Sequence, residues 1–514
     1  MAWPFSRRRK PAPRTGWVPP EKKPVDKKPG KKPVDKKPVD KKPVEKEPVE
    51  KAPAPPRVGA LRRSRWLDRQ GFYEPRVRGI KSTTRQAEAL NIAVAAPPTS
   101  PRGLIIGQDA ETGQSVVHDP FEAYAAGIIT SPNCIVIGDV GKGKSSLLKT
   151  WAVLRQLLLG RRVVVIDKKL DGKTKEGEYA PAARRFGVEP IKFTLDGTGS
   201  RINVLDPAIS AREAVGEASP AGQAMLLRAV LAEALERPLT PKEGKALRVA
   251  HRTALRRARA QSREAVIGDI VDALLQPDAD AARDARVDVD RLLEWGYDAA
   301  FELERMIEED LAGLVDAPTS ANVNLDAGLT VFDVSALPET GPALPIVMSI
   351  INTWLMNVLA NQDEPVQTVF VVEEGWHLIE GSFAKVARRN WKLARGLGLC
   401  NVVALHHISD VPADSPAIAM VKEAETVFIY GQAKEDDARE CVRLFNLPST
   451  AMNILLELPR GTPLVKIGTA DPIIVSHLRS DLEVELTNTD AAMAGTGVIV
   501  RDEETDLGSV EVNA

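Results

Sequence analysis

The chain has 514 residues, of which 43% are hydrophobic, and it carries a formal net charge of −1 at pH 7. This length allows two to four domains, and the hydrophobic content is sufficient for a large core. The three cysteines fit no metal-binding spacing and are typical of reduced core thiols. No secretory signal is evident, and no apolar run approaches the ~18 residues that a membrane span needs. These features predict a cytoplasmic protein.

The N-terminal segment, residues 1–58, is basic and of low complexity. Lys-Lys-Pro-Val-Asp recurs along it, and the first 60 residues carry 18 basic and 7 acidic side chains. Regular proline blocks helix and sheet, and the charge opposes collapse. We therefore expect a disordered Lys/Pro-rich tail, followed by a basic linker over 59–102 in which aromatic residues alternate with arginines. The start of the tail suits anionic lipid or nucleic acid, but its composition favours a solvated basic tail. The linker suits single-stranded nucleic acid or the acidic surface of a partner, and a plain linker or a docking helix accounts for it equally.

A phosphate-binding loop follows a short apolar strand at 134–137. The loop reads Gly-Asp-Val-Gly-Lys-Gly-Lys-Ser and is followed by a segment with helical character. This is the G-x-x-x-x-G-K-S pattern in its strand–loop–helix context. Its glycines let backbone N–H groups surround a phosphate, and Lys144 is predicted to reach the β- and γ-phosphates while Ser145 holds Mg²⁺. The predicted nucleotide-binding residues are Gly138, Asp139, Val140, Gly141, Lys142, Gly143, Lys144, Ser145 and Ser146.

Strands and helices alternate on both sides of this loop. Upstream, the pattern predicts a strand pair at 104–107 and 115–117. Downstream it predicts a buried strand at 162–167, a helix at 180–186 and a strand at 190–194. Residues 208–317 are rich in Ala, Leu, Arg and Glu with helical periodicity, which predicts an all-helical insertion.

Strands return after the insertion. Further strands are predicted at 329–334, 368–372, 401–405 and 426–430, helices at 345–359 and 383–396, and a hairpin at 463–467 with 473–475. Alternating strands and helices predict an α/β fold. We expect a RecA-like P-loop NTPase core with a mainly parallel sheet, built from residues 103–207 and 318–487. An acidic tail is expected over 488–514.

Polar residues follow two of the predicted strands at the ends where ligands of open α/β sheets bind. Glu373 and Glu374 follow 368–372, and we assign Glu373 to the metal ion and Glu374 to the attacking water as general base. His406 and His407 follow 401–405. We expect one of these two histidines to sense the γ-phosphate by hydrogen bonding, with a structural pair of histidines as the alternative.

Taken together, these residues resemble the VirB-type, TraC-like ATPases of conjugative type IV secretion, within the FtsK–HerA superfamily of P-loop motor ATPases. The resemblance rests on the phosphate loop and on residues 164–169, 177–180, 201–207, 331–335, 373–378, 459–461 and 487–490. Three positions depart from the family pattern. Glu373 replaces an aspartate, His407 replaces a polar sensor that is commonly glutamine, and Lys168 replaces a proline.

The resemblance implies an ATP-hydrolysing motor that energises conjugative DNA or protein transfer, with ATP and Mg²⁺ as cofactors. It implies a homo-hexamer that is cytoplasmic or peripheral at the inner face of the cell membrane, with membrane-embedded channel proteins and DNA as partners. It further implies an arginine supplied by the neighbouring subunit. Arg395 is the first candidate, on a segment expected to approach the phosphate-bearing edge of the sheet, and Arg460 is the second.

Two alternatives stay open. The first is an FtsK/HerA-type DNA translocase, against which the acidic core argues mildly. The second is a nucleotide-gated scaffold with weak turnover, which the longer side chain of Glu373 favours.

Overall fold

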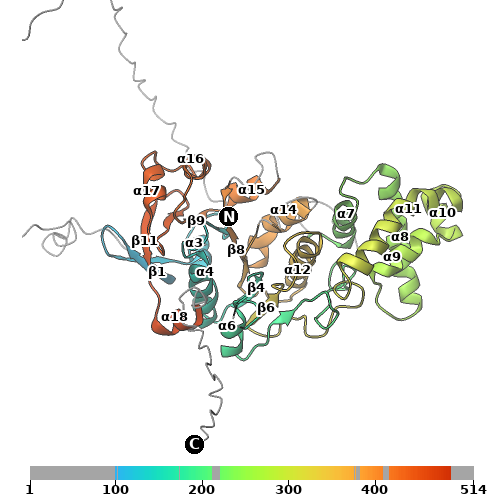
Figure 1. Ribbon diagram of the computed structural model, residues 1–514, viewed down its shortest axis with the longest axis horizontal. Coiled ribbons are helices and arrows are strands. Elements are labelled where there is room, and N and C mark those ends of the chain that lie inside the picture. The colour runs from blue at the N-terminus through green and yellow to red at the C-terminus, as the bar shows by residue number, and fades with distance from the viewer. Residues whose placement is uncertain are drawn as a thin grey trace, which may run out of the picture. The chain divides into compact units, whose positions relative to one another are not determined.

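The structure is a computed structural model that describes residues 99–487, apart from 101, 173, 211–219, 376, 378–382 and 409–415. The chain divides into two units, 1–80 and 81–514, and the described residues all belong to the second. The predicted tails over 1–58 and 488–514, and nearly all of the linker over 59–102, lie outside the described residues. Within the described residues, eleven strands form one sheet (Figure 1).

Neighbouring parallel strands form the larger part of this sheet. Their order is β9 (Thr426–Ile429), β3 (Cys134–Ile137), β8 (Leu399–Leu405), β7 (Thr368–Val372), β4 (Arg162–Asp167), β6 (Leu329–Asp333) and β5 (Ile191–Lys192). Every residue of β3, β6, β7, β8 and β9 is buried. Continuous burial is typical of a parallel sheet covered on both faces, and the predicted mainly parallel α/β fold is confirmed.

An antiparallel extension continues the sheet beyond β9. It consists of β10 (Leu464–Ile467), β11 (Ile473–His477), β1 (Leu104–Asp109) and β2 (Ser115–His118), each antiparallel to its neighbour. The predicted strand pair and hairpin thus lie side by side in one sheet. This arrangement pairs β1 and β11, from the two ends of the described chain, and β10 and β9 separate them from β3, the strand that leads into the phosphate loop.

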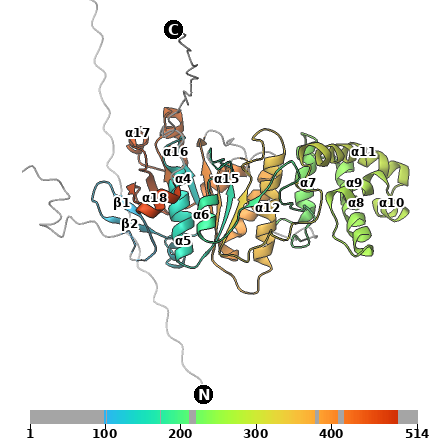
Figure 2. The ribbon, with the colours of Figure 1, turned by 60° about the horizontal axis from the view of Figure 1, so that its bottom comes forward.

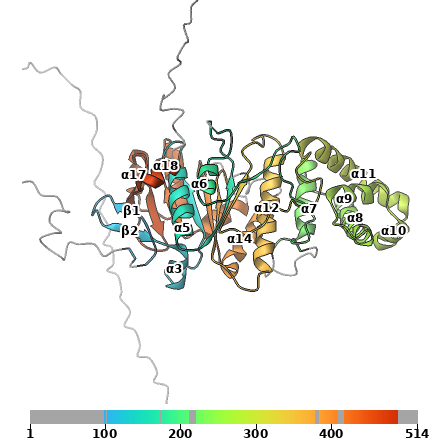
Figure 3. The same cartoon turned by 90° about the horizontal axis from the view of Figure 1, so that it is seen from below.

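Helices cover both faces of the sheet (Figures 2 and 3). Alternate strand residues belong to the two separate hydrophobic clusters, one on each face. On one face lie α3 (Pro120–Ala125), α6 (Ala180–Arg185) and the helix after the phosphate loop. That helix consists of α4 (Lys144–Leu147), a π-helical segment η2 (Leu148–Leu154) and α5 (Arg155–Leu158). It presses the buried ring of Trp151 edge-on against Phe428 of β9, with ring centroids 5.0 Å apart.

The opposite face is covered by α12 (Ala343–Ala360), α14 (Ala384–Leu393), α15 (Pro416–Glu423), α16 (Glu435–Leu444) and α17 (Ala451–Glu457). Among the described residues, one helix, α12, is long and apolar enough to cross a membrane; its mean hydropathy is 1.6. This corrects the expectation that no apolar run is long enough. Since 83% of α12 is buried within the fold, packing against the sheet accounts for its hydrophobicity.

The predicted helical insertion is confirmed for the described residues between β5 and β6. It comprises α7 (Gln223–Ala234), α8 (Pro241–Ala260), α9 (Ile267–Leu275), α10 (Ala279–Ala285), α11 (Val289–Arg305) and the π-helical segment η3 (Met306–Asp310). α7 packs against α12 and α14, whereas α8 to α11 pack on one another and lie beyond α7 in all three views (Figures 1, 2 and 3). The three cysteines are free and buried, as expected.

Candidate nucleotide-binding site

The phosphate loop joins β3 to α4 through a backbone that needs glycine at defined positions. Gly138, Gly141 and Gly143 have φ angles of 151°, 76° and 112°, a region that side chains disfavour. At Gly138 an added Cβ would also lie 2.5 Å from the Cβ of Tyr430. Gly143 is the N-cap residue of α4, so the loop delivers the helix N-terminus directly to the site.

Lys144 lies folded over this loop and is almost fully buried. Its ammonium donates hydrogen bonds to the carbonyl oxygens of Gly138 and Asp139, the second at 3.0 Å. Burial, followed by the charge of Lys169, lowers the pKa of Lys144 from 10.5 to about 8, although Glu374 and other carboxylates act to raise it. The ammonium is therefore still mainly charged at pH 7.

Glu374 and His406 connect the end of β7 to Lys144. The Nδ1 atom of His406 lies 3.3 Å from Lys144 Nζ, and its Nε2 atom lies 2.8 Å and 2.7 Å from the two carboxylate oxygens of Glu374. Since an ammonium can only donate, Nδ1 must accept, and the ring proton belongs on Nε2, where it is donated to Glu374. Glu374 has a φ of 53°, a strained conformation for a residue with a side chain, of the kind that often marks functional sites.

Glu373 points into the fold on the other side of the strand end. It is 2% exposed, and one carboxylate oxygen, Oε1, accepts a hydrogen bond of 2.9 Å from the Tyr179 hydroxyl. The other oxygen, Oε2, is buried without a hydrogen bond. Mg²⁺ prefers oxygen ligands, so the free carboxylate oxygen of Glu373 and the hydroxyl of Ser145 fit the predicted metal site.

Lys169, two residues beyond the end of β4, lies between these two groups. Its ammonium donates a 2.9 Å hydrogen bond to Ser145 Oγ and lies 3.9 Å from Glu373 Oε2. Burial acts to lower the pKa of Lys169, but the carboxylates of Glu373, Glu178 and Glu374 outweigh it, so the pKa is raised overall. Lys169 therefore places a permanent positive charge beside the predicted metal ligands.

A buried carboxylate layer behind Glu373 fixes the segment that carries Tyr179. Asp167 Oδ2 accepts a 2.7 Å hydrogen bond from the Tyr179 backbone N–H, and Asp333 Oδ2 accepts a 3.0 Å bond from Gly177 N–H. Burial, then the charge of Glu373, raises the pKa of Asp167 well above its usual value. The strand-end acids of β4 and β6 thus position the tyrosine that holds Glu373.

His407, the predicted sensor, turns away from Glu374. Its Nδ1 atom lies 3.3 Å from Asp139 Oδ1 and 3.2 Å from Asp437 Oδ2 on α16. Asp139 in turn accepts a hydrogen bond from the backbone N–H of Ala433 through its other oxygen. His407 therefore links the phosphate loop to the chain after β9, while His406 makes the contacts with Lys144 and Glu374. A sensing role for His407 stays a prediction.

A cleft of about 860 Å³ opens beside the loop. Its lining includes Gly143, Lys144 and Ser145 of the loop, together with Lys169, Arg460 and Arg479. Arg479 donates a 3.3 Å hydrogen bond to Ser146 Oγ. The cleft is therefore large enough for a nucleotide and is surrounded by cations that can meet its phosphates.

The two candidate arginines for action between subunits lie at different edges of the sheet. Arg460 is exposed beside the loop of its own chain. Arg395 is exposed in η5 (Ala394–Leu397), a 3-10 turn that precedes the amino end of β8. Since β8 is parallel to β3, Arg395 lies at the edge opposite the phosphate loop. This corrects the expectation that its segment approaches the phosphate-bearing edge of the same chain.

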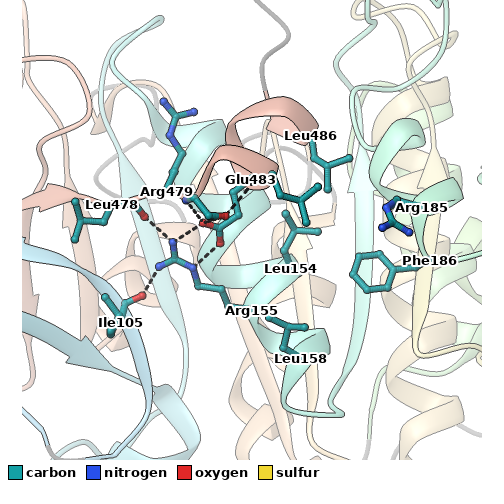
Figure 4. Close-up of a pocket in the computed structure, with 12 residues that line it drawn as sticks. Ile105, Leu154, Arg155, Leu158, Arg185, Phe186, Leu478, Arg479, Glu483 and Leu486 are labelled. Atoms are coloured by element: carbon teal, nitrogen blue, oxygen red, sulfur yellow. Dashed lines mark hydrogen bonds and ion pairs between the residues drawn. The ribbon is translucent and has the colours of Figure 1, made fainter.

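An apolar groove of about 800 Å³ lies next to the cleft, between α5, α6 and α18 (Asp481–Thr487) (Figure 4). Arg155 holds its wall in place: the guanidinium bonds Glu483 at 2.7 Å and 2.9 Å, the carbonyl of Leu478 at 2.5 Å and the carbonyl of Ile105 (Figure 4). Arg479 borders both the groove and the cleft. The position of α18 is thereby coupled to the cleft.

The structure brings the predicted loop residues, Glu373 and Glu374 together, and it adds residues that the sequence analysis did not assign to the site. These are Lys149, Lys169, Glu178, Tyr179, His406 and Arg479. Four of them were within reach of the sequence: Lys169, Glu178 and Tyr179 lie in family-like motifs after β4, and His406 directly follows a strand. Lys149 and Arg479 carry no such signal.

Comparison with solved structures finds this fold in VirB4 of Thermoanaerobacter pseudethanolicus, with a TM-score of 0.61 and 21% identity over 76% of this chain and 99% of that one. The bacterial conjugative coupling protein TrwB, in its sulphate complex, is less similar, with a TM-score of 0.49 and 16% identity over 79% of this chain and 94% of its own. TrwB with the ATP analogue ADPNP has a TM-score of 0.46 and 17% identity over 68% and 85% of the two chains. No protein-family model and no curated protein matches the chain. The comparison confirms the resemblance at the level of the fold: the described core is built like VirB4.

Proposed function

We propose that the protein is a Mg²⁺-dependent ATPase motor of a type IV secretion-like conjugation machine. The observation that carries the proposal is the series of side-chain contacts from Lys144 through His406 to Glu374, beside the phosphate loop. It joins a phosphate-binding cation to a carboxylate positioned as a general base. The shared fold with VirB4 supports the same assignment.

The chain's own residues supply the steps of hydrolysis. The loop N–H groups and Lys144 bind and orient the phosphates, and Arg460 and Arg479 add positive charge to the cleft. Glu374, oriented by the Nε2 proton of His406, accepts the proton of the attacking water. Ser145 and Glu373 are the residues that would hold Mg²⁺, which neutralises charge on the β- and γ-phosphates when bound.

The proposed assembly and location rest on the resemblance to the conjugative ATPases. We propose a cytoplasmic homo-hexamer that docks at the inner face of the membrane on channel proteins, with DNA as a further partner. Interfaces between subunits would close around ATP and reopen after hydrolysis. DNA-stimulated ATPase activity without any channel partner would instead favour the DNA-translocase alternative.

Two variants test the site. We expect Lys144→Ala to lose nucleotide binding, and Glu374→Gln to bind ATP normally but hydrolyse it at least about 100-fold more slowly, since an amide cannot accept the water's proton. Glu364→Gln is the matched control, because Glu364 is exposed before the amino end of the same strand, β7. Binding is measured with a fluorescent ATP analogue and turnover by phosphate release. Wild-type turnover in Lys144→Ala would refute the site.

A nucleotide-gated scaffold is the second candidate, favoured by the environment of Glu373. Its carboxylate is longer than the aspartate usual in the family, and it is engaged by Tyr179 and Lys169. If this geometry limits catalysis, Glu373→Asp should hydrolyse ATP faster than the wild type. An equal or slower rate, together with measurable wild-type turnover, would support the motor.

A further inference from the structure

Lys169 lies between the two side chains that fit the predicted Mg²⁺ site, Ser145 and Glu373. The Lys169 ammonium lies 2.9 Å from Ser145 Oγ and 3.9 Å from Glu373 Oε2. These two oxygens are the same groups that fit Mg²⁺. A single side chain thus places a monovalent cation between both candidate metal ligands.

This contact differs from an ordinary ion pair in the same cluster. Lys149 and Glu178 are joined directly, with nitrogen and oxygen 2.7 Å apart. Lys169 instead bonds to the hydroxyl of Ser145 and stays beyond hydrogen-bond distance of Glu373, whose buried Oε2 accepts no hydrogen bond. The arrangement balances the charge of Glu373 but leaves its oxygen available to a ligand.

Lys169 also has room to leave this position. Its side chain is 33% exposed and lines the large cleft as well as the narrow space between Glu373, Glu374 and His406. It can turn into the cleft without disturbing the buried strand β4. A divalent ion at the two oxygens would repel the ammonium in that direction.

We propose that Lys169 occupies the metal position of the nucleotide site and competes with Mg²⁺ for Ser145 and Glu373. The inference rests on the proposed nucleotide-binding function and deepens it. In the wild type the ammonium supplies part of the positive charge that Mg²⁺ would bring, so nucleotide binding depends only weakly on Mg²⁺. Without Lys169, the phosphates and Glu373 depend on the metal ion for that charge.

The test compares the affinity of the full chain for a fluorescent ADP analogue in excess Mg²⁺ and in EDTA. The quantity of interest is the ratio of the dissociation constant in EDTA to that in Mg²⁺. We expect this ratio to be about tenfold larger in Lys169→Met than in the wild type, the scale of one hydrogen bond to a charged group. Lys169→Gln, a second neutral variant, should behave like Lys169→Met.

A matched control and a direct metal readout complete the design. Lys175→Met removes the same charge from an exposed position on the following loop and should keep the wild-type ratio. Mn²⁺, followed by its paramagnetic resonance in the presence of ADP, should bind more tightly to both Lys169 variants than to the wild type.

The outcomes separate the two proposals. An unchanged ratio in both Lys169 variants, or an equal loss of affinity with and without metal, would overturn the competition with Mg²⁺. Failure of the wild type to bind ADP in either buffer would refute the nucleotide-binding function itself.

Discussion

The adjacent histidines His406 and His407, at the end of β8, contact different groups of the site. His406 bridges Lys144 and Glu374, whereas His407 faces the carboxylates of Asp139 and Asp437. The first arrangement joins the predicted phosphate-binding lysine to the proposed general base. The second ties the phosphate loop to α16, which follows the neighbouring strand β9.

We therefore expect His406→Ala to hydrolyse ATP about 100-fold more slowly while binding it with nearly unchanged affinity, because Glu374 loses the donor that orients it. His407→Ala is the matched control for loss of an imidazole at the same strand end. Steady-state phosphate release and binding of a fluorescent ATP analogue distinguish the two variants. A larger loss of turnover in His407→Ala would contradict this expectation and support the predicted sensing role of His407.

The phosphate loop could be predicted from sequence because its chemistry is local: one stretch of glycines, lysine and serine carries the strand, turn and helix signals. The choice between His406 and His407 could not, since it depends on how the chain turns after Leu405. Lys169 was visible as part of a motif, but its contact with Ser145 spans 24 residues of sequence. Such contacts follow from strand order, which local patterns do not reveal.

At the scale of elements, long β-branched runs and periodic helices were predictable from the sequence. Of the short helices, α6 was predicted and α18 was not. β4, β7 and β8 contain the apolar runs Val163–Ile166, Val369–Val372 and Val402–Leu405. α18 has seven residues, and its placement depends on Arg155 contacting Glu483 across 328 residues of sequence. Tertiary contacts of this kind fix a short helix whose own sequence signal is weak.

The helical insertion contains an element whose stability should depend on pH. α8 begins with a capping box: Thr240 accepts from the Glu243 backbone N–H, and Glu243 accepts from Thr240 N–H at 2.7 Å. Hydrogen bonds from Arg237, followed by those at the cap, lower the pKa of Glu243 from 4.5 to about 2, although its burial opposes this. A depressed carboxyl pKa stabilises the fold above pH 4.5, and this contribution is lost as the pH falls toward 2.

We expect Glu243→Gln to lower the free energy of unfolding by about 1 kcal/mol at pH 7. This value is small because Arg237 is partly exposed, and solvent weakens its interaction with Glu243. The difference from the wild type should shrink as the pH is lowered from 6 toward 3.5, as measured by thermal unfolding. Glu294→Gln, at an exposed position on α11, provides the control. A difference that stays constant with pH would exclude ionised Glu243 as its source.

At the scale of the whole molecule, the two arginine candidates occupy positions with different consequences for a ring. Arg460 borders the cleft of its own subunit, so it can meet phosphates without a neighbour. Arg395 lies beyond the amino end of β8, a seven-residue strand, and is separated from the phosphate loop by about 20 Å of sheet. It cannot serve its own cleft, but an exposed edge residue can serve the cleft of an adjacent subunit.

If Arg395 acts between subunits, activity must depend on assembly. Specific ATPase activity should rise with protein concentration, and Arg395→Ala should bind ATP normally yet hydrolyse it up to about 1,000-fold more slowly, the scale of an arginine finger. Arg389→Ala, a charge removal on the preceding helix α14, is the comparison variant. A concentration-independent rate in the wild type would argue against any residue supplied by a neighbour.

Mixing the Arg395→Ala and Lys144→Ala variants separates action between subunits from action within one. Each is inactive alone for a different reason, one lacking the arginine and the other the phosphate lysine. In a mixed ring, some interfaces pair an intact loop with an intact arginine, so part of the activity should return. The mixture is measured after co-assembly has been shown by size-exclusion chromatography with differently labelled subunits. Co-assembled rings without recovered activity would exclude Arg395 and leave Arg460, which already lies at the cleft, as the arginine to test next.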